Sequence, residues 1–451
     1  QKNQKYARGQ IMTPPRLSLA AMLIATFTLI APPVFADECT RLCDNDFMRE
    51  ATAQDIQTEI DKGADVKART EGGTTPLHFA AAWNNAEAIT VLLEAGADIE
   101  VRSKDGVTPL HYAAGLGNAE AITALIEAGA DIRAGDALGR TPLHYAAEMG
   151  NAEAVAAPLQ AGADIEARAE GGYTPLHLAA RLGNAEAVAA LIEAGANIEA
   201  RNEDGFTPLH EAANDGNAEA ITVLLQAGAN IEVRSKTGAT PLHGAANAEA
   251  VTALLETGAD IEARDILGRT PLHIAAILGK AEAVTALIVA GADIEARAEG
   301  GFTPLHGAAN AEAVTALIGA GADIEARAEG GLTPLHGAEN AEAVTALIGA
   351  GADIEARAEG GFTPLHGAEN AEAVTALIGA GADIEARNEN GLTPLHIAAI
   401  LGRAEAITAL IEAGANGKAR TSEGKIPFDY AKDNADLKNT KAYWLLNEAQ
   451  Y

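Results

Sequence analysis

Histidine is the residue type best suited to acid–base chemistry or metal binding, and here its spacing follows one rule. Each of the eleven histidines is the fourth residue of a Thr-Pro-Leu-His motif, TPLH. Zinc ligands lie about 2 Å from the ion, whereas equivalent atoms in neighbouring packed helices are roughly 8–10 Å apart. We therefore predict structural histidines and no metal site. They are His78, His111, His144, His177, His210, His243, His273, His306, His336, His366 and His396.

Other catalytic patterns are equally weak. The serines beyond the N-terminal region, Ser103, Ser235 and Ser422, have no Gly-x-Ser-x-Gly context, and no glycine-rich phosphate loop follows a strand pattern. Carboxylates recur at fixed positions in DIE and NAEA, which indicates solvated faces and helix N-termini. A weak calcium site along the acidic segments is an alternative. An enzyme would need a unit whose acidic residues depart from the repeat, and none stands out. We predict no enzyme activity, cofactor or metal.

These residues are carried by an internal repeat. Units that begin at Thr240, Thr303, Thr333 and Thr363 are 30 residues long, and the other units that begin with TPLH are 33 residues long. Residues 303–332 and 333–362 differ at only two positions. A fixed period in this range predicts a solenoid, in which each unit stacks on its neighbours. The motif begins at Thr75, Thr108, Thr141, Thr174, Thr207, Thr240, Thr270, Thr303, Thr333, Thr363 and Thr393.

Each unit contains the signals for two helices. Threonine is a good N-cap, proline fits the first helical position, and histidine falls where a capping box reaches back to the cap. Asparagine in Asn-Ala-Glu-Ala, NAEA, predicts the N-cap of a second helix. The glycine of Ala-Gly-Ala-Asp ends that helix in the left-handed conformation. An extended DIEAR segment and a polar turn then lead to the next TPLH.

This order of signals resembles the ankyrin repeat across residues 42–450. The resemblance implies an all-α repeat solenoid of stacked helix-turn-helix units with β-hairpin fingers, and a protein-protein interaction scaffold that catalyses nothing. Residues 37–74 are expected to hold the N-terminal region and a capping repeat. Residues 75–425 would form eleven repeats, and residues 426–451 a C-terminal capping repeat.

The resemblance also implies where a partner protein binds. In ankyrin repeats the residues between the two helices, the residue before each TPLH and the finger tips line a concave surface. The variable residues at these positions are therefore predicted to bind the partner. A second interpretation is that Trp83 and Met149 merely fill the groove between helices. The predicted partner-binding residues are Trp83, Leu116, Met149, Tyr173, Leu182 and Phe206.

The 30-residue units lack three residues in this region, and they place a glycine inside the first helix, at a cost of about 1 kcal/mol each relative to alanine. We therefore expect residues 303–392 to act as a spacer or as a platform for something repetitive. Pro158 falls inside a second helix, where it predicts a kink and a weak unit. The four glycines are Gly244, Gly307, Gly337 and Gly367.

Charge narrows the class of partner. The formal net charge of −31 argues against nucleic acid, because phosphate binding needs clustered lysine and arginine, and against anionic lipid. A protein partner with a basic patch remains compatible with it. The alternatives are a structural spacer or adhesion stalk without a defined partner, and an effector delivered to another cell.

The N-terminal segment resembles a secretory signal peptide. Arg16 precedes an apolar run over 17–30 that is shorter than the ~20 residues of a spanning helix. We expect residues 1–36 to be upstream residues and a signal peptide, with Met12 as initiator and cleavage after Ala36; a retained anchor is the alternative. The protein would then be exported, either periplasmic or secreted. In that setting Cys39 and Cys43 are predicted to form a disulfide, with free thiols or a metal site as alternatives.

Overall fold

The computed structural model describes residues 41–451. The expected signal peptide, residues 1–36, and Cys39 lie outside the described residues. The chain forms two compact units. Within the described residues, unit 1 comprises 41–236 with 256–258, and unit 2 comprises 237–255 with 259–451. These two compact units are numbered and described below by themselves; 'unit' without a number means one repeat of 30 or 33 residues.

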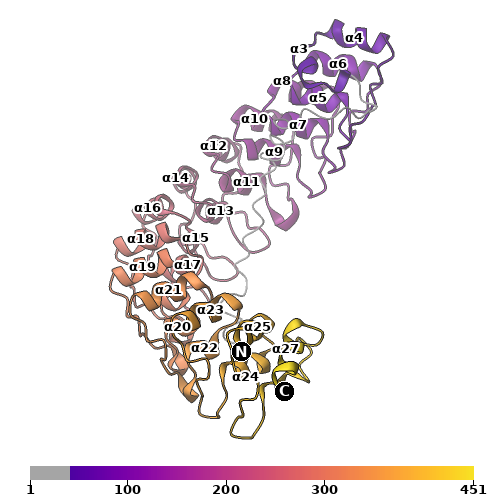
Figure 1. The fold of residues 1–451 in the computed structure, drawn as a ribbon. Coiled ribbons are helices and arrows are strands. Elements are labelled where there is room, and N and C mark those ends of the chain that lie inside the picture. Colours follow the sequence, from indigo (N-terminus) through magenta and orange to yellow (C-terminus); the bar gives the residue numbers. More distant parts are fainter. Residues whose placement is uncertain (1–40) are drawn as a thin grey trace. The chain divides into compact units, whose positions relative to one another are not determined.

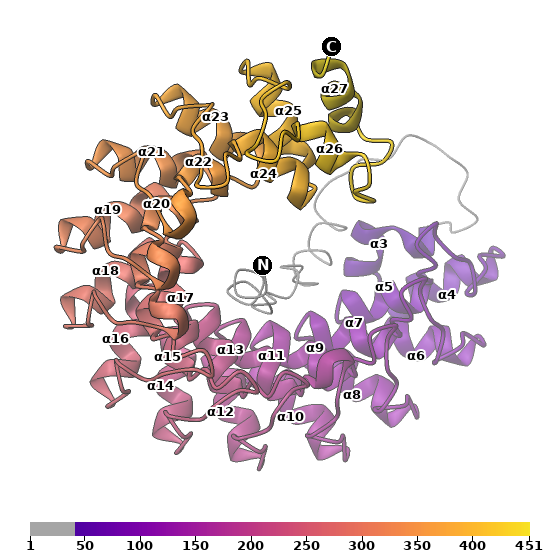
Figure 2. The same cartoon turned by 90° about the horizontal axis from the view of Figure 1, so that it is seen from below.

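Unit 1 is a stack of helix pairs in which the first helices form one row and the second helices form another (Figures 1 and 2). It begins with η1 (Arg41–Cys43), α3 (Asn45–Glu50) and α4 (Ala53–Asp61). The first helices of the repeats are α5 (Pro76–Ala82), α7 (Pro109–Gly115), α9 (Pro142–Met149), α11 (Pro175–Arg181) and α13 (Pro208–Asn214). The second helices are α6 (Ala86–Glu94), α8 (Ala119–Glu127), α10 (Ala152–Gln160), α12 (Ala185–Glu193) and α14 (Ala218–Gln226).

Unit 2 continues the same pattern with shorter first helices. The first helices are α15 (Pro241–Gly244), α17 (Pro271–Ile277), η4 (Pro304–Gly307), α20 (Pro334–Gly337), α22 (Pro364–Gly367), α24 (Pro394–Leu401) and α26 (Pro427–Ala431). The second helices are α16 (Ala248–Glu256), α18 (Ala281–Val289), α19 (Ala311–Gly319), α21 (Ala341–Gly349), α23 (Ala371–Gly379), α25 (Ala404–Glu412) and α27 (Lys441–Ala449).

Small side chains form most of the core between the two rows of helices. On α5, Leu77 and Ala81 are fully buried, and on α6 the residues Ala88, Ile89 and Leu92 are fully buried too. The buried positions of α6 follow the i, i+3, i+4 spacing of one helix face. Close packing of alanine and leucine explains how a chain with few aromatic residues builds a continuous core.

The first helices of the 30-residue units differ from expectation. The glycines predicted inside a helix are instead the last residues of one-turn helices, as at Gly337 in α20. A Cβ atom at Gly337 would lie 2.9 Å from the carbonyl oxygen of His306 in the preceding unit. Glycine is therefore used here because the backbones of neighbouring units approach closely, and the expected cost of an interior helical glycine does not apply.

The predicted β-hairpin fingers are turns, and the prediction of strands was wrong for the described residues. No residue between 41 and 451 is assigned to a β-strand. A typical finger is closed by two backbone hydrogen bonds, from Ser103 N–H to the Val107 carbonyl at 2.9 Å and from Gly106 N–H to the Ser103 carbonyl at 3.0 Å. It contacts the previous finger through Lys104 N–H, which donates to the Gly72 carbonyl at 3.0 Å. These bonds close a turn but are too few to form a strand ladder.

The helix ends largely follow the sequence signals. Gly96 follows α6 with φ of 91°, the left-handed conformation that the sequence predicts. Pro158 lies inside α10 and is buried, yet α10 spans nine residues, as α8 and α12 do. The helix is therefore not broken at Pro158, and the strain expected there stays a prediction. Within residues 41–451, no helix is both long enough and apolar enough to cross a membrane.

Candidate partner-binding face

The histidine side chains hold the stack together. Nδ1 of His111 lies 3.2 Å from the backbone nitrogen of Thr108 and 2.8 Å from its Oγ1, and Nε2 lies 2.9 Å from the backbone oxygen of Arg140, the residue directly before the next TPLH motif. Because Nδ1 accepts the threonine N–H, the proton must sit on Nε2, which donates to the carbonyl. The predicted cap is confirmed, and the same ring also connects its helix to the boundary with the next unit.

Burial keeps these imidazoles neutral. Desolvation lowers the pKa of His336, His366 and His396 below the usual value. It lowers the pKa to about 4 for six further histidines, which are His78, His111, His144, His177, His273 and His306. A ring with both nitrogens engaged in hydrogen bonds has no lone pair for a metal ion or a substrate. In the described residues, no group of three or more potential ligand side chains is placed to hold a metal.

The recurring acidic and amide residues also connect units, which the sequence analysis missed. Glu100 of a DIE segment accepts the backbone N–H of Asp131 in the next unit at 2.7 Å. Asn118 of NAEA donates to the Ala81 and Ala82 carbonyls of the preceding unit at 2.9 and 2.7 Å. The interpretation of these glutamates as solvated faces is therefore incomplete. Recurrence of a residue in every unit was the signal that could have indicated a contact between units.

We call the predicted partner-binding residues of unit 1 the first-helix face. Trp83, Leu116 and Leu182 are the residues after α5, α7 and α11, and Met149 is the last residue of α9. Tyr173 and Phe206 directly precede the N-caps of α11 and α13. All six are half-buried. Four of them thus lie at the C-terminal ends of first helices, and two lie just before the N-terminal ends.

Some residues of the first-helix face are already engaged within the chain. The indole Nε1 of Trp83 donates to Oδ1 of Asn45 at 3.0 Å, and the Arg49 guanidinium lies 5.5 Å from the Trp83 ring centre. The Tyr173 ring packs edge-on against His177 and lies 5.3 Å from the Arg181 guanidinium. Trp83 therefore covers the junction with α3, which favours the groove-filling interpretation for this residue.

A buried polar cluster next to the first-helix face was not predicted. Arg140 donates to Oδ2 of Asp136 at 2.9 and 2.7 Å, and the Tyr145 hydroxyl donates to the same oxygen at 2.9 Å. Nη1 of Arg140 also lies 3.6 Å from the Glu148 carboxylate. Burial raises the pKa of Glu148, although Arg140 opposes the shift. The satisfied hydrogen bonds indicate a structural cluster that fixes a finger turn to its helix.

Glu211 on α13 corrects the expectation that no acidic residue departs from the repeat. It occupies the position after the histidine, where Tyr145 and Leu178 stand in the two preceding units, and it is 2 % exposed. Its Oε1 accepts from Nδ2 of Asn202 at 3.1 Å. Burial raises the pKa of Glu211 to about 7. The nearby charge of Asp215 adds to this shift, whereas Arg181 and a hydrogen bond with Tyr173 oppose it.

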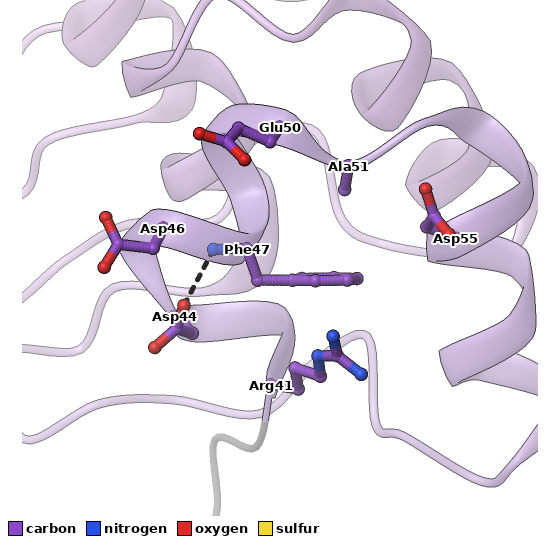
Figure 3. Close-up of a pocket in the computed structure, with 7 residues that line it drawn as sticks. All are labelled: Arg41, Asp44, Asp46, Phe47, Glu50, Ala51 and Asp55. Atoms are coloured by element: carbon purple, nitrogen blue, oxygen red, sulfur yellow. Dashed lines mark hydrogen bonds between the residues drawn. The ribbon is translucent and has the colours of Figure 1, made fainter.

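An open pocket lies at the N-terminal end of unit 1, between η1, α3 and the start of α4 (Figure 3). Phe47 and Arg41 stand against each other there, with the guanidinium 4.5 Å from the ring centre. Asp44 caps α3 by accepting the Phe47 N–H at 2.7 Å. Arg41, Asp44 and Phe47 are therefore engaged with one another in this pocket.

The predicted disulfide involves a residue that the structure does not describe. Cys43 lies in η1, but Cys39 is outside the described residues, so the disulfide stays a prediction.

The repeating helix pairs and their shared hydrogen bonds define a helical repeat solenoid built for stacking. A family model described as ankyrin repeats (3 copies) matches the chain at residues 49–136, 96–169, 129–202, 159–235, 199–265, 242–328, 305–388 and 365–450. The protein belongs to the ankyrin repeat family. Such domains are generally protein-binding scaffolds and typically not catalytic.

Comparison with individual proteins gives a similar solved structure, which matches about half of this chain. The solved human ASB11 ankyrin repeat domain is 30% identical to the chain, and the match covers 48% of this chain and 97% of that one, with a TM-score of 0.43. A search among curated proteins finds no match.

Proposed function

We propose that the protein is a non-catalytic scaffold that binds a partner protein on the first-helix face of residues 75–239. The observation that carries the proposal is the contrast between fixed and variable positions. The fixed residues are used in contacts that hold the stack together, as His111 and Glu100 are. The variable positions at the ends of successive first helices hold the half-buried residues Leu116, Met149 and Leu182, and then the exposed Asp215.

Charge and rigidity indicate the kind of partner. The chain carries a formal net charge of −31, so a partner with a basic patch would associate faster and at lower concentration in low salt. Because the hydrogen bonds between units preform the face, little backbone entropy is lost on binding. Aromatic and aliphatic side chains on such a face supply the buried contact area.

Site-specific photo-crosslinking tests the proposal. A photo-reactive amino acid would replace Leu116 or Leu182 on the first-helix face. The matched controls are Thr123 on α8 and Thr222 on α14, both exposed on second helices. We expect one and the same protein to crosslink from positions 116 and 182 and not from the controls. Equal crosslinking from all four positions, or none from any, would favour a spacer or adhesion stalk without a defined partner.

We propose in addition that the protein is exported, on the strength of the basic start and the apolar run over 17–30. N-terminal sequencing of the protein made in its own host should give Asp37 as the first residue. A product that retains the apolar run would indicate an anchor. A cleaved product found inside another cell would support delivery as an effector.

A further inference from the structure

Two second helices begin with a residue that is poor for that position. Lys280 precedes α18 and Arg403 precedes α25, and neither side chain caps its helix. The other second helices that follow a TPLH motif have asparagine there. A cation at a helix N-terminus is disfavoured by the helix dipole. No cap hydrogen bond is lost relative to α8, α12 and α14, because their asparagines make none either. Some other contact must offset the unfavourable position of the charge.

The two exceptions share one circumstance. Lys280 and Arg403 belong to 33-residue units that directly follow 30-residue units, and no other unit with TPLH stands in that order. The preceding first helices, α15 and α22, are four residues long, against seven or eight in the longer units. With three residues fewer, the last carbonyls of the helix are displaced by about 4.5 Å.

The contacts show how the longer side chains reach across. Between two long units, Nδ2 of Asn118 bonds to the Ala82 carbonyl, four residues after His78. Across a shortened unit, Nζ of Lys280 donates to the Gly244 carbonyl at 2.8 Å, one residue after His243. Each bond therefore ends at a carbonyl in the last turn of the preceding first helix, although that turn comes earlier in the shortened unit.

Arg403 repeats this arrangement with an added ion pair. Its Nη1 donates to the Gly367 and Ala368 carbonyls at 2.9 and 3.2 Å, and its Nη2 lies 2.8 Å from Oε1 of Glu369. The Arg403 side chain is 14% exposed. Donation to carbonyls at the C-terminal end of a helix is favourable for a cation. The preceding unit therefore supplies a favourable helix end for the charge of Arg403, which the N-terminal end of α25 disfavours.

We propose that Lys280 and Arg403 are length adaptors, positioning residues that allow a full-length unit to stack on a shortened one. Among the units that begin with TPLH, asparagine serves the junctions between two long units, between two shortened units, and where a shortened unit follows a long one. Lysine or arginine stands where a long unit follows a shortened one, so in a long unit the residue before the second helix matches the length of the unit that precedes it. In this chain the adaptors join the shortened units to the longer units that follow them.

Amide hydrogen exchange of the full chain tests the proposal. Lys280→Asn should speed exchange in α15 and α17 about tenfold, the loss expected for one hydrogen bond to a charged group. Lys280→Arg should remain close to wild type. Arg403→Asn should act in the same way on α22 and α24, and serves as an independent second site. Unchanged exchange in both asparagine variants would overturn the proposal.

A variant in which the unit before Lys280 is lengthened tests whether Lys280 is needed only because that unit is short. The alternative is that lysine was copied with its unit and has no relation to unit length. Insertion of three residues between Ala246 and Asn247 restores the 33-residue length of the unit that precedes Lys280. In that background Lys280→Asn should be neutral or should slow exchange, because asparagine again reaches the end of the helix. An equal acceleration in both backgrounds would show that Lys280 acts independently of unit length and would refute the proposal. Asn118→Lys, placed between two long units, should accelerate exchange.

Discussion

The units from 75 to 239 and the near-identical units from 303 to 392 share the same histidine contacts but differ in their first helices. In both regions the histidine connects its helix to the boundary with the next unit: Nε2 of His111 lies 2.9 Å from the Arg140 oxygen, and Nε2 of His336 lies 3.1 Å from the Phe362 oxygen. The first region places different side chains at the ends of seven- or eight-residue first helices. The second has one-turn helices that end in glycine. The contacts that stack the units therefore do not depend on the residues that vary at the ends of the first helices.

The two regions also differ in how completely they bury the histidines. His111, His144 and His177 are fully buried, whereas His306 and His336 are 7% and 6% exposed; His366 of the shortened units is 2% exposed, as His210 of the long units is. Two of the three rings in the units from 303 to 392 are therefore covered less than those in the long units. The following predictions use this contrast, from the largest expected effect to the smallest.

The largest expected effect is a loss of stability at low pH. It should be greatest in the units from 75 to 239. Unfolded histidine binds a proton below about pH 6.5, whereas native His111 stays neutral down to a pKa of about 4. The contribution of the buried histidines to the free energy of unfolding is therefore fully present above pH 6.5 and falls as the pH decreases towards 4. Between pH 7 and 5 each such histidine should cost about 2 kcal/mol. Urea unfolding across this range, with hydrogen exchange for each region, measures the loss, and a pH-independent midpoint would contradict it.

Glu211 should have the opposite pH dependence, because it lowers the free energy of unfolding as the pH rises. Its pKa is raised to about 7 by burial, so the native carboxyl holds its proton where the unfolded one, with a pKa near 4.3, has lost it. Stability is lost as the pH rises between these values, by about 3 kcal/mol at pH 8. Glu211→Gln keeps an acceptor for Asn202 and should restore stability at pH 8 but not at pH 5. Glu219→Gln, at an exposed site on α14, should change stability little at either pH.

Pro158 tests whether the varied region contains a weak helix. Proline in α10 removes one backbone hydrogen bond, although the helix keeps its length. Pro158→Leu, which copies Leu125 of α8, should raise the free energy of unfolding by about 2 kcal/mol. The reverse change, Leu125→Pro, should lower it by at least as much. If Pro158→Leu leaves the urea midpoint unchanged, the helix is not strained.

Two glycines of one shortened unit should respond with opposite signs. Gly337→Ala places a Cβ 2.9 Å from the His306 carbonyl oxygen and should destabilise by about 1 kcal/mol. Gly349, the last residue of α21, has open space around a Cβ, so Gly349→Ala should stabilise by about 1 kcal/mol. Thermal unfolding of the two variants measures both effects. Equal signs would mean that close approach does not explain the glycine at 337.

Most of the fold was predictable because the signals are local. Threonine, proline and histidine start each first helix, and the left-handed Gly96 ends a second helix, through interactions within a few residues. What the sequence did not reveal depends on the neighbouring unit: the bond from Nε2 of His111 to Arg140, the bond from Glu100 to Asp131, and the absence of strands in the fingers. These features need the register of two stacked units, which spacing along one chain does not specify.

The places of the candidate residues on the helices were predictable, but their contacts were not. Variation between units placed Leu116, Met149 and Leu182 correctly at the ends of first helices. It did not show that Trp83 is bonded to Asn45, because that contact joins residues from units without a shared motif. Glu211 was visible as a departure from the apolar residues at its position, and only its burial revealed that the carboxyl group is retained inside the stack.

The most direct test of the separation between stacking and recognition compares two variants in binding the crosslinked partner. One variant carries Leu116→Asp and Met149→Asp. The other lacks residues 303–362, which leaves a shortened unit after a long unit, as in the intact chain. The account predicts that the substitutions weaken the affinity at least tenfold, while the deletion leaves it within about twofold. Intact binding by the substituted variant together with lost binding by the deletion would contradict it.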